Sequence, residues 1–158
     1  MPAPRYARPG SARAGFSTRS LLVEAVLALL LVALLLAAQI LEGRAALAWT
    51  RYHAAQAPFA RRPGEHARQA GHWAAQAVEL LAPLPEGAEA ARLALGVGQS
   101  IEARDHAAAL TLYTQVRAAL ERVRGSRWRG LGLGGLAAEA ARLAEAARVR
   151  ERGPIERP

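Results

Sequence analysis

Apolar residues form one long, nearly unbroken run near the start of the chain. Residues 21–41 read LLVEAVLALLLVALLLAAQIL, and the only charged residue in this run is Glu24, close to its beginning. A helix of about 20 apolar residues crosses the hydrocarbon core of a bilayer. A buried helix of a soluble protein would need a large surrounding core, which the rest of this chain cannot supply. The run therefore predicts a transmembrane helix over residues 21–41.

Beyond this run the apolar residues recur at helical spacing, and no segment alternates in the manner of a strand. The first helix is predicted to continue to Pro58, with one face made of Leu41, Ala45, Ala48, Trp49 and Tyr52. Further helices are expected over about 65–82, 88–104, from after His106 to about 124, and from about 136. Short loops between amphipathic helices favour antiparallel hairpins. The predicted fold class is all-α: one transmembrane helix followed by a small helical-hairpin domain.

The predicted inward-facing residues are Ala70, Trp73, Ala77, Leu80 and Leu81 in the second helix, Leu93, Val97 and Ile101 in the third, Leu110, Tyr113, Val116, Leu120 and Val123 in the fourth, and Leu136, Ala140, Leu143 and Ala147 in the fifth. Gly96 and Gly98 lower the helix propensity of the third helix and predict a close helix contact there. The predicted organisation is a disordered basic leader over 1–20, the transmembrane helix over 21–41, a juxtamembrane helix and loop over 42–64, the helical domain over 65–152 and a flexible tail over 153–158.

Charge around the apolar run predicts the topology. The leader carries Arg5, Arg8, Arg13 and Arg19 and no acidic residue, which by the positive-inside rule keeps the N-terminus in the cytoplasm. The domain after the run is then expected outside the cytoplasm, on the periplasmic side of a bacterial inner membrane. The competing interpretation is a signal peptide cleaved near Ala48. Because signal peptides have apolar regions of about 7–15 residues, the longer run favours an uncleaved signal anchor.

Composition narrows the chemistry. The chain has 158 residues, no cysteine, and 21 basic residues that are all arginine. It can therefore form neither a disulfide nor a thiolate metal site. Many of its apolar residues are alanines, which favour helix but fill little volume. We therefore expect a thin core.

A partial repeat points to a known architecture. His72 and His106 are separated by the tetratricopeptide period, and Ala75 stands in register with Ala109. Residues 93–123 resemble one degenerate tetratricopeptide unit. Fewer than three such repeats seldom bury a stable core, so we expect homo-oligomerisation or docking to a partner.

Residues 102–128 resemble a family of proteobacterial single-pass membrane proteins in which a membrane helix precedes a short tetratricopeptide-like helical domain. The matching positions are Glu102, Ala103, Arg104, Asp105, Ala109, Leu110, Tyr113, Arg117, Leu120, Arg124 and Trp128. The chain departs from the pattern in lacking the usual glycine between Arg104 and Asp105 and in its shortened PLPEG loop. The resemblance implies an architecture but no activity, because none is established for the family.

A glycine-rich segment raises the question of a nucleotide site. Gly130, Gly132 and Gly135 have the GxGxxG spacing, but a dinucleotide fingerprint follows a β-strand, and here an arginine-rich helical stretch precedes it. A helix N-terminus can still hold an anion. The candidate residues for contact with a partner or an anionic lipid are Arg117, Arg122, Arg124, Arg127, Trp128 and Arg129. The alternative is a solvated arginine face beside a flexible linker.

No arrangement of residues indicates catalysis, a cofactor or a metal. His66 and His72 are not spaced to share one helical face, and neither Ser100 nor Ser126 lies in a nucleophile elbow. The net charge is +8, with +4 from the leader, but the predicted topology keeps the domain away from nucleic acid.

Two functions are therefore expected. The first is a non-enzymatic, membrane-anchored helical module that binds another envelope or inner-membrane protein. The alternative is a lipid-facing structural element, which uses the arginine and tryptophan loop over residues 122–135 on an anionic membrane surface.

Overall fold

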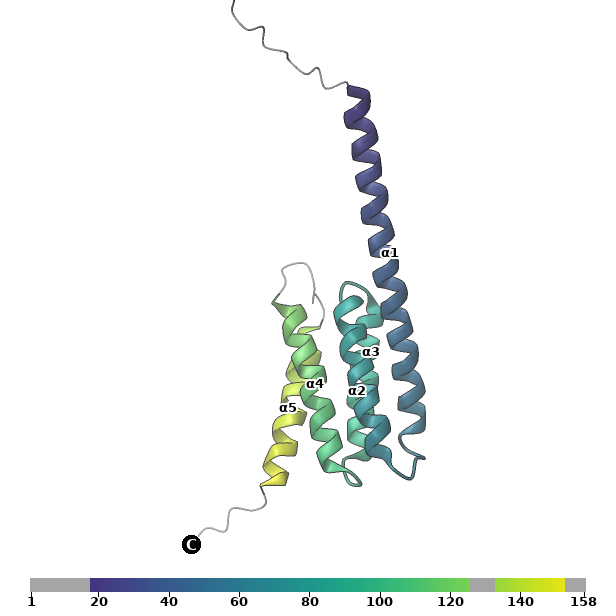
Figure 1. Ribbon diagram of the computed structural model, residues 1–158. Coiled ribbons are helices and arrows are strands. Elements are labelled where there is room, and N and C mark those ends of the chain that lie inside the picture. The colour runs from purple at the N-terminus through teal and green to yellow at the C-terminus, as the bar shows by residue number, and fades with distance from the viewer. Residues whose placement is uncertain (1–17, 126–132, 153–158) are drawn as a thin grey trace, which may run out of the picture. The chain divides into compact units, whose positions relative to one another are not determined.

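The computed structural model describes residues 18–125 and 133–152, with side chains from residue 21 onward. The described residues form five α-helices and no strand, as the all-α prediction requires (Figure 1). The helices are α1 (Thr18–Gln56), α2 (Pro63–Leu80), α3 (Pro85–Ile101), α4 (His106–Arg124) and α5 (Gly134–Glu151). Successive helices run in alternating directions, so the expected helical hairpins are present.

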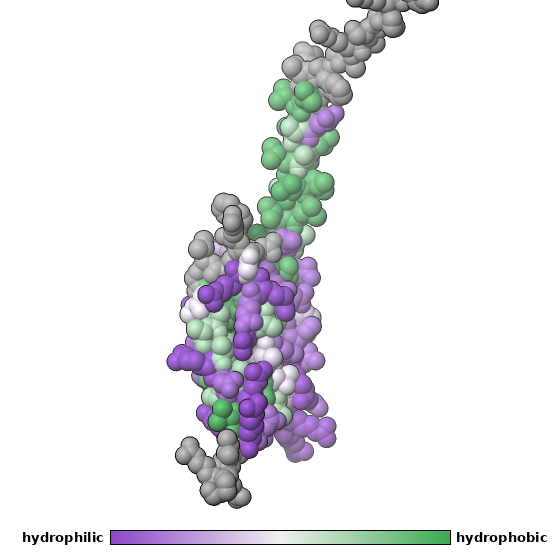
Figure 2. Space-filling model, turned by 90° about the vertical axis from the view of Figure 1, so that its left-hand side faces the viewer, coloured by the Kyte–Doolittle hydropathy of each residue, from purple (hydrophilic) through white to green (hydrophobic). Residues whose placement is uncertain are grey.

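The first half of α1 is apolar on every side. Its leucine and valine side chains between Leu21 and Leu36 are all at least half exposed. Among the described helices, only α1 is long and apolar enough to cross a membrane. Figure 2 shows hydrophobic side chains along this part of the chain. By length and composition this segment could cross the hydrocarbon core of a bilayer.

The chain divides into two compact units, residues 1–35 and 36–158. Residues 42–64, which are predicted as a juxtamembrane helix and loop, lie in the second unit and contribute Ala46, Leu47 and Ala57 to its core. The viewed face of the second unit is mainly hydrophilic (Figure 2). From here on, "the helical domain" means residues 36–158.

The face of α1 that packs is not the apolar face seen in the sequence. Leu41, Trp49 and Tyr52 are exposed, whereas Gly43, Ala46, Leu47 and Thr50 are buried. Gly43 lies so close to Leu81 that a Cβ there would stand 2.6 Å from the leucine Cγ. The Thr50 hydroxyl donates to the Ala46 carbonyl at 2.9 Å. Small residues thus let α1 approach α2 closely, while Leu41, Trp49 and Tyr52 stay exposed.

Proline and aspartate define where the later helices begin. Pro63 and Pro85 occupy the first turns of α2 and α3, where the missing N–H has no helical partner to lose. Asp105 caps α4, since its carboxylate accepts a hydrogen bond of 3.0 Å from the Ala108 N–H. The helices α2, α3 and α4 therefore start at positions with a local chemical reason.

The core of the helical domain is thin, as expected. It consists largely of alanines, and the largest fully buried side chain is that of Tyr113. Most predicted inward-facing residues are buried, and the rest, Trp73, Leu80, Leu93, Leu110 and Leu143, are half-buried. Gly98 makes the predicted close contact, because a Cβ there would collide with the Tyr113 ring. Gly96 does not, since a Cβ there would meet nothing within 4 Å.

Residues that are 34 positions apart in the sequence do not occupy equivalent positions in their helices. His106 is the first residue of α4, whereas His72 lies in the middle of α2. The helices instead pair as α2 with α3 and α4 with α5, and α2 also packs against α4. Two stacked hairpins therefore describe the domain better than a unit starting in α3.

Candidate functional site

A groove opens on the surface of the helical domain between the end of α1 and α3. It has a volume of about 440 Å³ and is lined by Ala54, Pro58, Glu89, Arg92, Leu93, Gly96, Val97 and Ser100. Most of its lining is apolar, and its charged groups come from Glu89 and Arg92. Glu89 is paired with Arg51 of α1 at 2.6 Å. The groove can therefore accept apolar side chains beside a charged rim.

Gly96 shapes the floor of this groove. A glycine inside a helix costs about 1 kcal/mol relative to alanine. At Gly98 packing against Tyr113 explains the glycine, but at Gly96 a Cβ would stand in open space. The packing of the domain thus gives no reason for a glycine at position 96. Close approach of another molecule to the α3 backbone would give one.

The turn after α1 presents an aromatic side chain beside the groove. Phe59 is 88% exposed, and the neighbouring Pro58 lines the groove. Arg104, just beyond α3, donates hydrogen bonds to the carbonyls of Pro58 at 2.8 Å and Ala60 at 3.2 Å. Arg104 therefore fixes the backbone on both sides of Phe59. Exposed aromatic residues on a fixed backbone are common anchors at protein interfaces.

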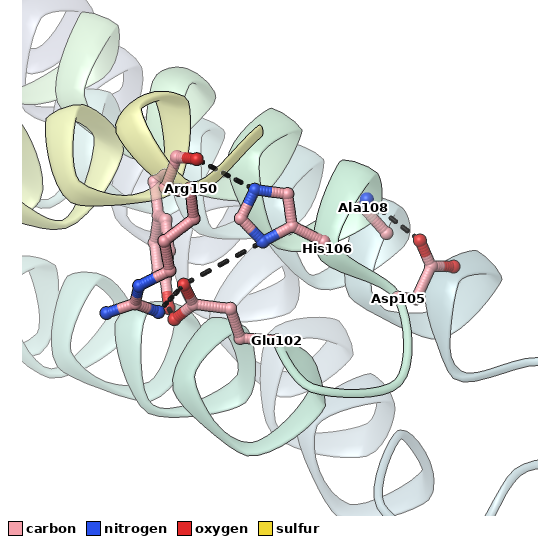
Figure 3. A network of polar contacts seen from close by, with 7 residues as sticks. Glu102, Asp105, His106, Ala108 and Arg150 are labelled. Atoms are coloured by element: carbon pink, nitrogen blue, oxygen red, sulfur yellow. Dashed lines mark hydrogen bonds and ion pairs between the residues drawn. The ribbon is translucent and has the colours of Figure 1, made fainter. Parts of the chain in front are cut away.

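A polar network fastens α5 at the same end of the domain (Figure 3). The Glu102 carboxylate accepts hydrogen bonds from Arg150 and, at 3.2 Å, from the Tyr113 hydroxyl. His106 donates from Nε2 to the Ala147 carbonyl at 2.8 Å. Burial raises the pKa of Tyr113 far above its ordinary value, and the Glu102 charge adds to the rise. Because these groups hydrogen-bond to one another across three helices, the network holds α5 against α3 and α4.

Two histidines meet across α1 and α2. His53 Nδ1 lies 3.1 Å from His66 Nδ1, and both rings line a polar pocket with Glu65, Arg68 and Gln69. Burial lowers the pKa of His53, and the neighbouring His66 lowers it further. Sequence reasoning paired His66 with His72 and so missed this contact, which depends on how α1 and α2 fold together.

The structure places only part of the predicted arginine cluster. Arg127, Trp128 and Arg129 lie outside the described residues, as do Gly130 and Gly132. Arg117 pairs with Glu121 at 2.7 Å. Arg122 pairs with Glu79 of α2, its Nε lying 2.9 Å from the carboxylate. Arg124 is exposed. Two of the three described arginines therefore already have carboxylate partners.

The dinucleotide interpretation does not fit the described residues. The element before the glycines is the helix α4, and no strand occurs in the described part of the chain. Gly135 lies in the first turn of α5, where a Cβ would meet nothing within 4 Å. The strand that gives the GxGxxG spacing its meaning is therefore missing from this part of the fold.

The groove, its exposed aromatic neighbour and the histidine pair were not predicted from the sequence. Each depends on contacts between helices that are distant along the chain. The sequence holds one partial signal, because Gly96 is a glycine inside a predicted helix. Comparison with known protein families, with curated proteins and with solved structures finds no match.

Proposed function

We propose that this chain is a membrane-anchored interaction module, whose helical domain lies outside the cytoplasm and binds a segment of another envelope protein. The groove between α1 and α3 carries the proposal. It offers apolar surface at Leu93 and Val97, an otherwise unexplained glycine at position 96, and the exposed Phe59 close by. The proposal assigns no catalytic role to any residue.

The anchoring part of the proposal rests on the apolar half of α1. Its length and composition suit a membrane span. The four arginines of the leader support a cytoplasmic N-terminus, which would put the helical domain on the other side of the membrane. The resemblance to single-pass proteobacterial proteins agrees with this arrangement and stays a prediction.

Charge indicates which partner segment the groove would accept. After Glu24 is counted, the residues beyond the leader and the span hold +5 of the net charge of +8. Arg92 lies exposed on the rim of the groove and forms no ion pair with another described residue. We therefore propose a partner segment with apolar side chains for the groove and acidic side chains for its rim.

The substitution Gly96→Leu tests this function, because it fills the groove without disturbing the core. Gly135→Leu is the matched control, since it also replaces a helical glycine facing open space, but on α5 and away from the groove. The tagged full-length chain is purified from cross-linked membranes of the native host, and the proteins that it captures are identified. We expect the unchanged chain and Gly135→Leu to capture the same defined envelope protein.

Capture by Gly96→Leu is expected to fall about tenfold or more, which corresponds to about 1.4 kcal/mol of binding free energy. Neither leucine should lower the thermal stability, because leucine has a higher helix propensity than glycine. Equal capture by both variants would overturn the assignment of the groove. Capture of no defined protein by any of the three chains would overturn the function itself.

A second candidate function is that of a lipid-facing structural element, and the arginines at one end of the domain support it. Arg122 is paired with Glu79, and the neighbouring Leu80 and Leu81 contact Gly43, where α1 enters the domain. Arg122 and Arg124 therefore lie at the same end of the domain as Gly43. Guanidinium groups at that end could meet anionic lipid headgroups. The proposed part of Arg127, Trp128 and Arg129 in such a contact stays a prediction.

A further inference from the structure

His53 and His66 bring two imidazole nitrogens to one point. His53 lies in the last turn of α1 and His66 in the first turn of α2, and their Nδ1 atoms are 3.1 Å apart. The adjoining pocket has a volume of about 360 Å³ and is lined by both rings and by Glu65, Arg68 and Gln69. Two nitrogen ligands from separate helices therefore converge beside a space that can hold water.

The spacing suits two ligands of one transition-metal ion. Imidazole nitrogens bind such ions at about 2.0–2.1 Å, so nitrogens 3.1 Å apart subtend an angle of about 95–102° at the metal. That angle lies between the right angle of tetragonal Cu²⁺ sites and the larger angle of tetrahedral Zn²⁺ sites. The helices would not have to move far to hold either ion.

We propose that His53 and His66 form a binding site for a late first-row divalent cation, Cu²⁺ or Zn²⁺. Each ring supplies its Nδ1 atom, and water fills the remaining positions. Without metal, one Nδ1–H donates to the other Nδ1. When the metal binds, that proton moves to Nε2 of its own ring, so that both Nδ1 atoms present lone pairs.

The remaining positions at the metal are open to solvent. In the described part of the chain, no third histidine, aspartate or glutamate lies near enough to complete a group of three ligands. Glu65 lines the same pocket but is turned toward Arg62 at 3.7 Å, and Arg68 repels a cation. These neighbours limit the affinity, and a site with nitrogen ligands generally binds Cu²⁺ more tightly than Zn²⁺.

Bound metal would tie α1 to α2 at this end of the domain. A ligand that binds only the folded state raises the unfolding temperature, and the rise grows with the logarithm of the ligand concentration above its Kd. The Trp49 ring centroid lies 6.1 Å from that of His53 and 6.2 Å from that of Trp73. Bound Cu²⁺ should therefore quench indole fluorescence, which provides a readout of occupancy that is separate from stability.

The test titrates the full-length chain in detergent micelles with Cu²⁺ and, separately, with Zn²⁺. The affinity tag contains no histidine. The variants are His53→Gln and His66→Gln, and the controls are His72→Gln and His106→Gln, which alter the two remaining histidines of the chain. Calorimetry gives the stoichiometry, fluorescence reports Cu²⁺ near Trp49, and circular dichroism checks that each variant is folded.

We expect one Cu²⁺ per chain, weaker binding of one Zn²⁺, and a rise in the unfolding temperature with either ion. Binding, quenching and stabilisation should all be lost in His53→Gln and in His66→Gln, and retained in both controls. If folded His53→Gln binds Cu²⁺ as the unchanged chain does, or if a control variant loses the binding, the site is not at this pair. The proposal also fails if neither ion binds the unchanged chain.

Discussion

At the scale of single residues, Tyr113 shows what spacing can and cannot predict. Its place on the inward face of α4 followed from the helical repeat of apolar residues, and the ring is fully buried against Gly98. Its hydrogen bond to Glu102 did not follow from the repeat, because Glu102 lies beyond the end of a different helix. A pattern along one helix identifies a buried face, but the partner of a polar atom depends on the neighbouring helix.

This residue makes the stability of the domain sensitive to alkaline pH. Burial raises the pKa of Tyr113 in the folded chain above the unfolded value of about 10. A raised pKa contributes stability that is fully present below pH 10 and is lost as the pH climbs above it. We expect the unchanged chain to lose unfolding free energy as the pH rises above about 10, as measured by denaturant unfolding.

The variant Tyr113→Phe removes this dependence, and at pH 7 it should cost about 1 kcal/mol through the lost hydrogen bond to Glu102. Tyr52→Phe is the control, because Tyr52 is half exposed. An alkaline loss that persists in Tyr113→Phe would show that another group is responsible.

At the scale of helices, the number and approximate extent of the elements followed from the sequence, but one packing face did not. Alanine and glycine contribute little to a hydropathy pattern, so the pattern of large apolar residues in α1 predicted the wrong packing face. Helices approach most closely where side chains are smallest, which is why Gly43 and Ala46 face the core. In an alanine-rich chain, residue size therefore indicates the packed face better than hydropathy does.

The helix α5 has a thin apolar face and depends on polar contacts to stay in place. Its buried residues are Leu136, Ala137, Ala140, Ala144 and Ala147. Arg150 pairs with Glu102, whose side chain is only 14% exposed. Replacing Glu102 by glutamine removes the charge that holds Arg150. We expect a loss of about 1.5–3 kcal/mol in unfolding free energy and faster amide exchange along α5.

The matched control is Glu145→Gln, which removes the exposed pair between Glu145 and Arg148 at 3.8 Å within α5 itself. Surface pairs of this kind contribute about 0–1 kcal/mol. Hydrogen exchange of both variants measures the difference. Equal protection of α5 in the two variants would mean that its apolar face alone keeps it docked.

At the scale of the whole molecule, the sequence predicts the long apolar segment of α1 more directly than it predicts the groove or the histidine pair. A membrane span needs only a continuous apolar run, so the apolar half of α1 could be predicted without knowing what packs on it. The groove and the histidine pair need two helices each, and no local pattern records that juxtaposition. The long apolar segment can therefore be recognised in the sequence alone, whereas the groove and the histidine pair appear only in the folded chain.

The position of Arg122 and Arg124 gives a test of contact between the domain and the bilayer. Because the chain has no cysteine, a fluorophore can be attached at one chosen site. The two labelling sites are made by Gly125→Cys and Ala103→Cys. Position 125 lies directly after α4, near these arginines, and position 103 lies in the turn after α3, at the opposite end of the domain. The labelled full-length chains are placed in nanodiscs of zwitterionic or partly anionic lipid.

If the lipid-facing function is correct, the label at position 125 shifts its emission to the blue in anionic nanodiscs, and the label at 103 does not. The shift should shrink at high salt, because ionic screening weakens contacts between arginine and headgroups. It should also shrink when Arg122 and Arg124 are both changed to glutamine. Identical emission from the two labels in both lipids would exclude this function and leave the groove as the working surface of the domain.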